Sequence, residues 1–219
     1  MAGCSRAPIW LTVEVVLWAT LLQLTLGIAL GWLLARKQFV GKGLLDVAVM
    51  LPLVFPPIVL GYALLVALGR NGWLMIALPE ALRPEIVFAT PGLVIAAFVA
   101  GLPLMVKPVQ TAFMAISPRM REAAATLGEG RWGIFRRVDW PLARRGIAAG
   151  LILSVGRALG EVGISLMLGG NVLGRTETLS LAIYNNVMDG QFDCANHLSL
   201  LMVGVTAVAF FLLRRYGTL

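Results

Sequence analysis

Charged residues are scarce in this sequence. Aspartate, glutamate, lysine and arginine make up 13% of its 219 residues, whereas apolar residues make up 59% and the mean hydropathy is +0.87. In soluble domains about a quarter of the residues are charged, so this composition excludes the soluble class. It indicates an integral membrane protein.

Lysine, cysteine and histidine are also scarce. Neither serine nor threonine follows any of the three lysines, so the chain has no phosphate-binding loop of the form G-x-x-x-x-G-K-[ST]. We therefore expect neither a nucleotide site nor enzymatic activity. Cys4 and Cys194 have neither metal-ligand spacing nor the pattern of a disulfide framework, so we expect them to be incidental and predict no metal site. The single histidine, His197, is expected at an interface and not as a ligand.

Five stretches are long and apolar enough to cross a membrane, which takes roughly 20 residues of helix. The first is longer than the apolar core of a signal peptide, so we expect a retained helix. The sequence predicts an all-α, polytopic membrane protein that forms a single transmembrane domain over residues 1–219. The predicted spans are 9–35, 44–68, 91–116, 146–168 and 195–213.

Basic residues are distributed unequally between alternate loops. Twelve lie in the loops after the first and third spans and in the C-terminal tail, against three in the other two loops. Cytoplasmic loops carry the excess of lysine and arginine. The sequence therefore predicts an external N-terminus and a cytoplasmic C-terminus in a cell membrane. This topology accounts for the basic residues, so we expect no nucleic-acid partner.

The loop between the third and fourth spans is unusually long for a connection. It contains seven arginines and an alanine run at 123–125. A helix is predicted over 118–127, ended by Gly128, and a second helical piece over 132–138 is predicted to stop before Pro141. One interpretation is an amphipathic segment lying on anionic lipid. The other is a docking site for a protein, which the slim alanine face favours.

Seven residues of this loop have a characteristic spacing. They are Glu122, Ala123, Ala124, Gly128, Val138, Trp140 and Pro141. Their spacing resembles the signature EAA-x3-G-x9-I-x-L-P of the permease subunits of bacterial ABC importers, with valine in place of isoleucine and tryptophan in place of leucine. We call residues 117–145 the signature segment, and the resemblance implies that it is the coupling element, which docks into a groove on the ATP-hydrolysing subunit.

The same resemblance implies the partners of the chain. These are two cytoplasmic ATPase subunits, which bind ATP and magnesium that this chain does not hold, an external oxyanion-binding protein and the lipid bilayer of the bacterial inner membrane. A five-span bundle alone encloses little pathway, so we also expect a second copy of the chain, as a homodimer.

Other segments resemble molybdate permeases. They lie within residues 31–191 and comprise 41–46, 51–62, 102–106 and 157–163, while 168–171 is similar to some tungstate permeases. Molybdate or tungstate is therefore the expected substrate, and sulfate or thiosulfate is the alternative because sulfate permeases share much of this pattern. An ion-gradient-driven carrier is a further alternative, but it would usually show internal repeats and several acidic residues within its spans, and neither is evident.

Prolines interrupt two of the predicted spans. A proline removes a backbone donor and clashes with the preceding turn, and irregular backbone at membrane depth is tolerated only beside protein or a wet cavity. These spans are therefore predicted to line the translocation pathway, although packed kinks without a pore role are the alternative. The candidate residues are Pro52, Pro56, Pro57 and Pro103.

Three ionisable residues in the predicted spans are further pathway candidates. Arg157 and Glu161 lie four positions apart, so they share a helix face and can pair. A clasp between helices is the expected role of the pair, with direct substrate contact as the alternative. Lys107 is expected either to extend toward the inner interface or to line the pathway. Outside the spans, 178–188 is predicted to be a helix on the outer rim that contacts the binding protein or plugs the bundle.

Overall fold

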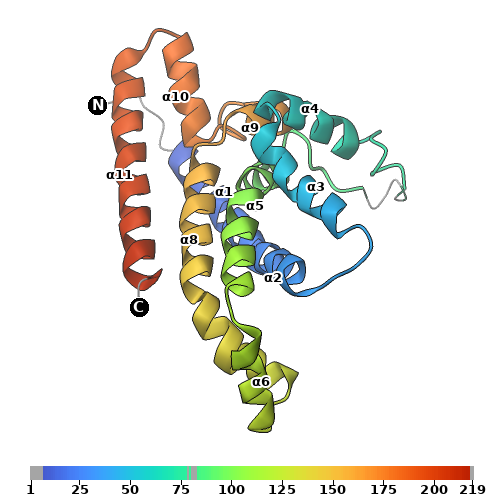
Figure 1. Ribbon diagram of the computed structural model, residues 1–219. Helices are drawn as coiled ribbons and strands as arrows, with labels where there is room; N and C mark the ends of the chain where they lie inside the picture. Colours follow the sequence, from blue (N-terminus) through green and yellow to red (C-terminus); the bar gives the residue numbers. More distant parts are fainter. Residues whose placement is uncertain (1–6, 78, 80–82, 218–219) are drawn as a thin grey trace.

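The computed structural model of the protein describes residues 7–77, 79 and 83–217, and the elements within these ranges are all helical (Figure 1). The prediction of an all-α membrane protein is confirmed. Three helices are long and apolar enough to cross a membrane, and a bent helix pair makes a possible fourth. The predicted count of five continuous spans is not reached among the described residues, because the second predicted span is divided.

The first membrane-crossing helix extends from Ala7 to Arg36. It comprises α1 (Ala7–Leu22), a π-helical turn η1 (Gln23–Gly27) and α2 (Ile28–Arg36). The buried side chain of Gln23, at the start of this turn, donates a hydrogen bond to the carbonyl of Ala97 at 3.2 Å. The amide nitrogen of a buried polar side chain is therefore bonded to the neighbouring helix at the point where the regular α-helical pattern is interrupted.

Residues 44–68 form two short helices where one span was predicted. These are α3 (Lys42–Val54) and α4 (Pro57–Leu68), and Figure 1 shows them meeting at an angle. Phe55 and Pro56 have extended ψ values of 145° and 130°, because a residue that precedes proline disfavours the α-helical region. Pro57 also lacks the amide needed to continue the helix. Neither helix alone has the length of a span.

Helix α5 (Thr90–Met114) is the central element of the bundle (Figure 1). It packs against α2, α3, α8 and α9 and contributes Met105, Val109 and Phe113 to the largest buried cluster. Its contact with α8 is close because that helix presents glycines. A Cβ atom at Gly150 would lie 2.9 Å from the carbonyl oxygen of Met105. Small residues at such crossings let membrane helices approach closely.

The predicted fourth span is bent. Helix α8 (Trp140–Leu159) ends at Gly160, and α9 (Gly163–Gly169) follows at an angle of 59° to the helix before it. Helix α9 then crosses α4, where a Cβ atom at Gly61 would lie 2.8 Å from Cβ of Met167. The two interrupted segments of the chain therefore pack against each other.

The last helices form an antiparallel pair, α10 (Leu179–Met188) and α11 (Phe192–Gly217) (Figure 1). The predicted helix over 178–188 is thus present, but it stands alongside α11 and does not lie flat on the rim. Cys194, in α11, is disulfide-bonded. The expectation that the cysteines are incidental is therefore wrong for Cys194, while Cys4 lies outside the described residues.

Candidate functional site: the signature segment and the pathway residues

The first helix of the signature segment is α6 (Pro118–Thr126). Pro118 occupies its first turn, where a missing amide costs nothing. The helix ends in a Schellman motif, in which the amide of Gly128 donates to Ala125 O at 3.0 Å and that of Glu129 to Ala124 O at 3.1 Å. Gly128 has a φ of +86°, a left-handed conformation that glycine adopts without strain. The predicted helix and its glycine stop are both present.

Helix α6 projects beyond the end of the bundle (Figure 1). None of its residues is buried, Glu122 and Ala123 are exposed, and Ala124 is half-buried. Within the part of the chain that the structure describes, the Glu122 carboxylate has no ion-pair partner. Helix α6 therefore offers a narrow surface with an unpaired carboxylate.

The sequence predicts that the second helical piece of the segment stops before Pro141. In the structure it does not stop there. Helix α7 (Arg131–Ile134) continues through a π-helical turn η3 (Phe135–Asp139) directly into α8. The amide of Trp140 donates to Phe135 O, the wider spacing of a π turn. Pro141 can follow because it falls in the first turn of α8, where its missing amide is tolerated. The signature segment is thus continuous with a bundle helix.

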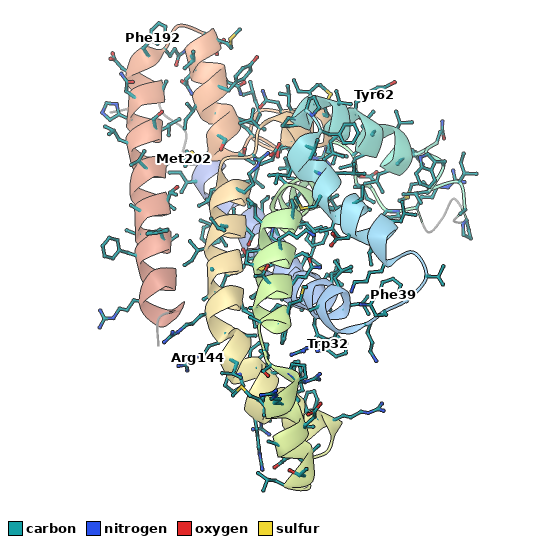
Figure 2. All side chains as sticks on the ribbon, in the orientation of Figure 1. Trp32, Phe39, Tyr62, Arg144, Phe192 and Met202 are labelled. Carbon is teal, nitrogen blue, oxygen red and sulfur yellow. The ribbon has the colours of Figure 1, made fainter. Side chains whose placement is uncertain are left out.

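Phe135 lies at the centre of an aromatic cluster that joins the segment to the bundle. Its ring stacks on Trp132 at 5.5 Å and on Phe113 of α5 at 6.4 Å, and it meets Trp32 of α2 edge-on at 6.5 Å. The ring of Trp140 is 6.3 Å away. Figure 2 places Trp32 at the end of the bundle from which α6 projects. Val138 packs against the buried cluster that contains Met105, Val109 and Phe113, whereas Trp140 is 44% exposed.

Asp139 forms the second link between the segment and the bundle. Its side chain is 1% exposed, and Oδ1 lies 3.1 Å from a guanidinium nitrogen of Arg36 and 3.2 Å from Nε of Arg121. Arg36 ends α2 and Arg121 belongs to α6, so one buried carboxylate connects three elements. A buried carboxylate requires such partners, because an unpaired charge is costly away from water. Sequence analysis missed all three residues, and the one available signal was a single aspartate among many arginines.

The structure pairs Lys107 with an acidic residue of α3. Lys107 Nζ lies 2.6 Å from Asp46 Oδ1 of α3 and 3.2 Å from Gln110 Oε1. Both ionic side chains are about one-third exposed. Lys107 therefore ties α5 to the first half of the divided span.

Arg157 and Glu161 are paired as the sequence predicted, with 2.5 Å between nitrogen and oxygen. Glu161 lies in the bend between α8 and α9, and its other oxygen accepts a hydrogen bond from the amide of Ile164 at 2.7 Å. The buried carboxylate thus caps α9 and holds the bend.

The proline candidates occupy different environments. Pro52 lies inside α3, Pro103 is buried inside α5, and Pro56 is exposed at the break between α3 and α4. Pro57 begins α4 and contacts α9, since a Cβ atom at Gly163 would come within 2.7 Å of it. Among the described residues, no group of three or more histidine, cysteine or acidic side chains has the arrangement of a metal site.

Comparison with known proteins shows which family this chain matches. Residues 27–216 match the family described as "Binding-protein-dependent transport system inner membrane component". The chain is 41% identical to the Molybdenum transport system permease protein ModB of Escherichia coli K12, over 76% of this chain and 72% of that protein. It is 33% identical to the Sulfate transport system permease protein CysW of a Synechocystis strain, over 97% and 78%.

A solved structure has the same fold. It is the crystal structure of a bacterial ABC transporter involved in the import of the acidic polysaccharide alginate, with a TM-score of 0.79 and 19% identity, over 97% of this chain and 78% of that chain. Both the family match and the sequence relatives extend over most of the chain. The protein therefore belongs to the family of binding-protein-dependent transport system inner membrane components.

Proposed function

We propose that the chain is the transmembrane permease subunit of an ATP-driven oxyanion importer, with molybdate as its substrate and tungstate as the nearest related ion. The observation that carries the choice of ion is the 41% identity to a molybdenum transport permease, against 33% to a sulfate transport permease. Sulfate or thiosulfate is the second candidate because the sulfate permease aligns with nearly the whole chain.

Helix α6 is the surface on which ATP hydrolysis would act. Its exposed face, including Glu122, is free to enter a groove on a separate ATPase subunit. Two such subunits would bind the ATP and magnesium and would meet two copies of the permease. Movement of α6 would reach the bundle through Asp139 and Phe135, which contact α2, α5 and α8. Val138, Trp140 and Pro141 would keep η3 and α8 in register behind it.

The pathway would lie against the divided helices. The ionic groups near them are already paired, Lys107 with Asp46 and Arg157 with Glu161, so they would not hold a dianion tightly. Weak binding suits conduction, because an ion must leave as readily as it enters. Tight capture would belong to an external binding protein, in keeping with the name of the family.

A second copy of the chain would cover the exposed face of α3 and α4. Both helices expose large apolar side chains, including Val54, Phe55, Ile58 and Tyr62, and contiguous apolar surface marks an interaction site or a lipid contact. Pairing of two copies across this face would enclose a pathway that one bundle alone does not. We place the chain in the bacterial inner membrane with the end that carries α6 in the cytoplasm.

Uptake by the reconstituted complex tests the proposal. The permease, its ATPase and its binding protein are placed in vesicles, and ATP-dependent uptake of labelled molybdate is measured with unlabelled molybdate, tungstate or sulfate as competitor. We expect molybdate and tungstate to compete strongly and sulfate weakly. Stronger competition by sulfate than by unlabelled molybdate would transfer the assignment to the sulfate class, and uptake without ATP would contradict the mechanism.

A further inference from the structure

A groove of about 910 Å³ runs along α2 to the start of α8. Its first part is apolar and includes Leu24, Ile28 and Trp32, which lie within the membrane-crossing helix Ala7–Arg36. Its second part lies against α7 and η3 and includes Trp132 and Trp140. One end of the groove is thus at membrane depth, and the other reaches the signature segment outside the spans.

The charges in the groove are gathered at the second end. Four cations line it, namely Arg36, Lys37, Arg121 and Arg131, and the one acid among the lining residues is Asp139. Arg36 and Arg121 contact this acid. Lys37 and Arg131 are exposed and form no ion pair with any described residue. The groove therefore offers two unpaired cations beside an apolar wall.

We infer that this groove binds an anionic phospholipid, with the phosphate between Lys37 and Arg131 and an acyl chain along Leu24, Ile28 and Trp32. The combination of charge and shape selects this ligand. Basic pockets beside transmembrane helices bind acidic headgroups, and tryptophans gather at the level of the headgroups. A free phosphate would satisfy the cations but leave the apolar wall uncovered. The lipid would contact Trp32, Trp132 and Trp140, which surround Phe135.

Tryptophan fluorescence provides the test, because three of the six tryptophans line the groove. Trp10, Trp18 and Trp73 are changed to phenylalanine, which leaves the groove tryptophans as reporters. The full-length permease with its ATPase is placed in phosphatidylcholine vesicles that contain either brominated phosphatidylglycerol or brominated phosphatidylcholine at the same mole fraction. We expect the anionic lipid to quench more strongly. The preference should fall roughly fivefold for each of Lys37→Gln and Arg131→Gln, the effect of one cation near an anionic membrane.

Matched variants separate binding from general electrostatics. Arg144 and Arg145 are exposed on α8 and do not line the groove, and Figure 2 shows Arg144 and Trp32 on opposite sides of α8 in that view. Arg144→Gln and Arg145→Gln should leave the preference unchanged, and the charge-conserving changes Lys37→Arg and Arg131→Lys should preserve it.

Three results would overturn the inference. Equal quenching by the two lipids would show no selectivity for an anionic headgroup. Relief of quenching by millimolar inorganic phosphate would identify a site for the free ion. Reporters that neither lipid quenches would mean that a partner chain fills the groove. None of these results depends on which oxyanion is transported, so the inference and the proposed function fail separately.

Discussion

Helices α6 and α10 are of similar length, yet they are held in the molecule in different ways. Helix α6 buries no residue, and its described polar link to the bundle is the ion pair between Arg121 and Asp139. Helix α10 buries Leu179, Ser180, Leu181 and Ala182. Its first amide donates to the Thr12 hydroxyl at 2.7 Å, and Ser180 donates to the carbonyl of Leu159 at 2.7 Å.

The difference distinguishes a helix that completes the bundle from one whose surface stays exposed. Helix α10 gains its stability from many buried contacts, so loss of one of them should cost little function. Helix α6 depends on few contacts, and its free surface is what a partner would recognise. Changes in α6 or its anchor should therefore affect coupling, whereas changes in α10 should affect stability alone.

The largest effect is expected from Asp139→Ala. The substitution leaves Arg36 and Arg121 without their shared carboxylate, and removing one member of a buried ion pair costs about 3–5 kcal/mol. Both the thermal stability and the ATP-dependent uptake should fall. The control is Arg137→Ala, which removes an ion pair of Glu129 with an arginine that is 73% exposed, because exposed pairs contribute about 0–1 kcal/mol. Equal stability of the two variants would show that Asp139 does not anchor α6 to the bundle.

The next effect is expected from Gly128→Val. The φ of +86° at this position costs a residue with a side chain about 1 kcal/mol or more, so the end of α6 should be distorted. We expect loss of uptake and weaker retention of the ATPase, with normal abundance in the membrane. Gly130→Val is the matched control, because Gly130 has a φ of −71° and open space around its Cβ position.

Glu122→Lys tests the surface of α6 without altering its fold. The carboxylate is exposed and has no ion-pair partner among the described residues, so reversing its charge should leave stability unchanged. If it faces a basic group of the ATPase, retention of the ATPase and uptake should both decrease. Co-purification of the two subunits measures the first and vesicle assays the second. Normal values of both would mean that α6 is not the docking surface.

A smaller effect is expected from Ser180→Ala in α10. The variant loses a buried hydrogen bond to Leu159, which contributes about 1 kcal/mol, while retention of the ATPase should not change. Thr126→Ala is the counterpart in α6, since it removes a side-chain bond to a backbone carbonyl that is exposed to solvent. We expect that variant to unfold at the wild-type temperature. A loss of ATPase binding in the Ser180 variant would break the distinction between the two helices.

The smallest effect on stability and uptake is expected in a test of topology. Single cysteines at Gly130, beside α6, and at Leu173, an exposed residue before α10, should change neither stability nor uptake. Cys194 is disulfide-bonded and so should not react with a thiol reagent. An impermeant reagent added from outside intact cells should label the cysteine at 173 but not the one at 130. The reverse pattern would invert the proposed orientation.

Local features of both helices could be read from the sequence because they depend on neighbouring residues. Pro118 and Gly128 bound α6 as predicted, and the apolar spacing of 178–188 indicated α10. The ion pairs between distant helices could not be read in this way. Arg36 and Asp139 lie 103 positions apart and Lys107 and Asp46 lie 61 apart, so only the packing of the helices brings them together.

Two of the errors in the elements have a common cause, which is the influence of proline position. The sequence predicts a continuous span through Pro56 and Pro57, yet these consecutive prolines lie where one helix ends and the next begins. The sequence predicts that a helix stops before Pro141, yet this proline falls in the first turn of α8 and follows a π turn that accommodates it. The effect of a proline depends on whether the helix requires a backbone hydrogen bond from that position to the preceding turn. The wider structure determines this.

The π turn η1 determines the direction in which the side chains of α2 point. A π turn holds about one residue more than an α-helical turn, and each residue of an α-helix rotates the chain by about 100° around the axis. If Gln23–Gly27 were regular α-helix, every side chain beyond this turn would be rotated around the helix axis by about that angle. Trp32 and Arg36 would then face away from Phe135 and Asp139. The phase of one helix, adjusted by a single turn deep in the bundle, thus determines whether its far end meets the segment that α6 belongs to.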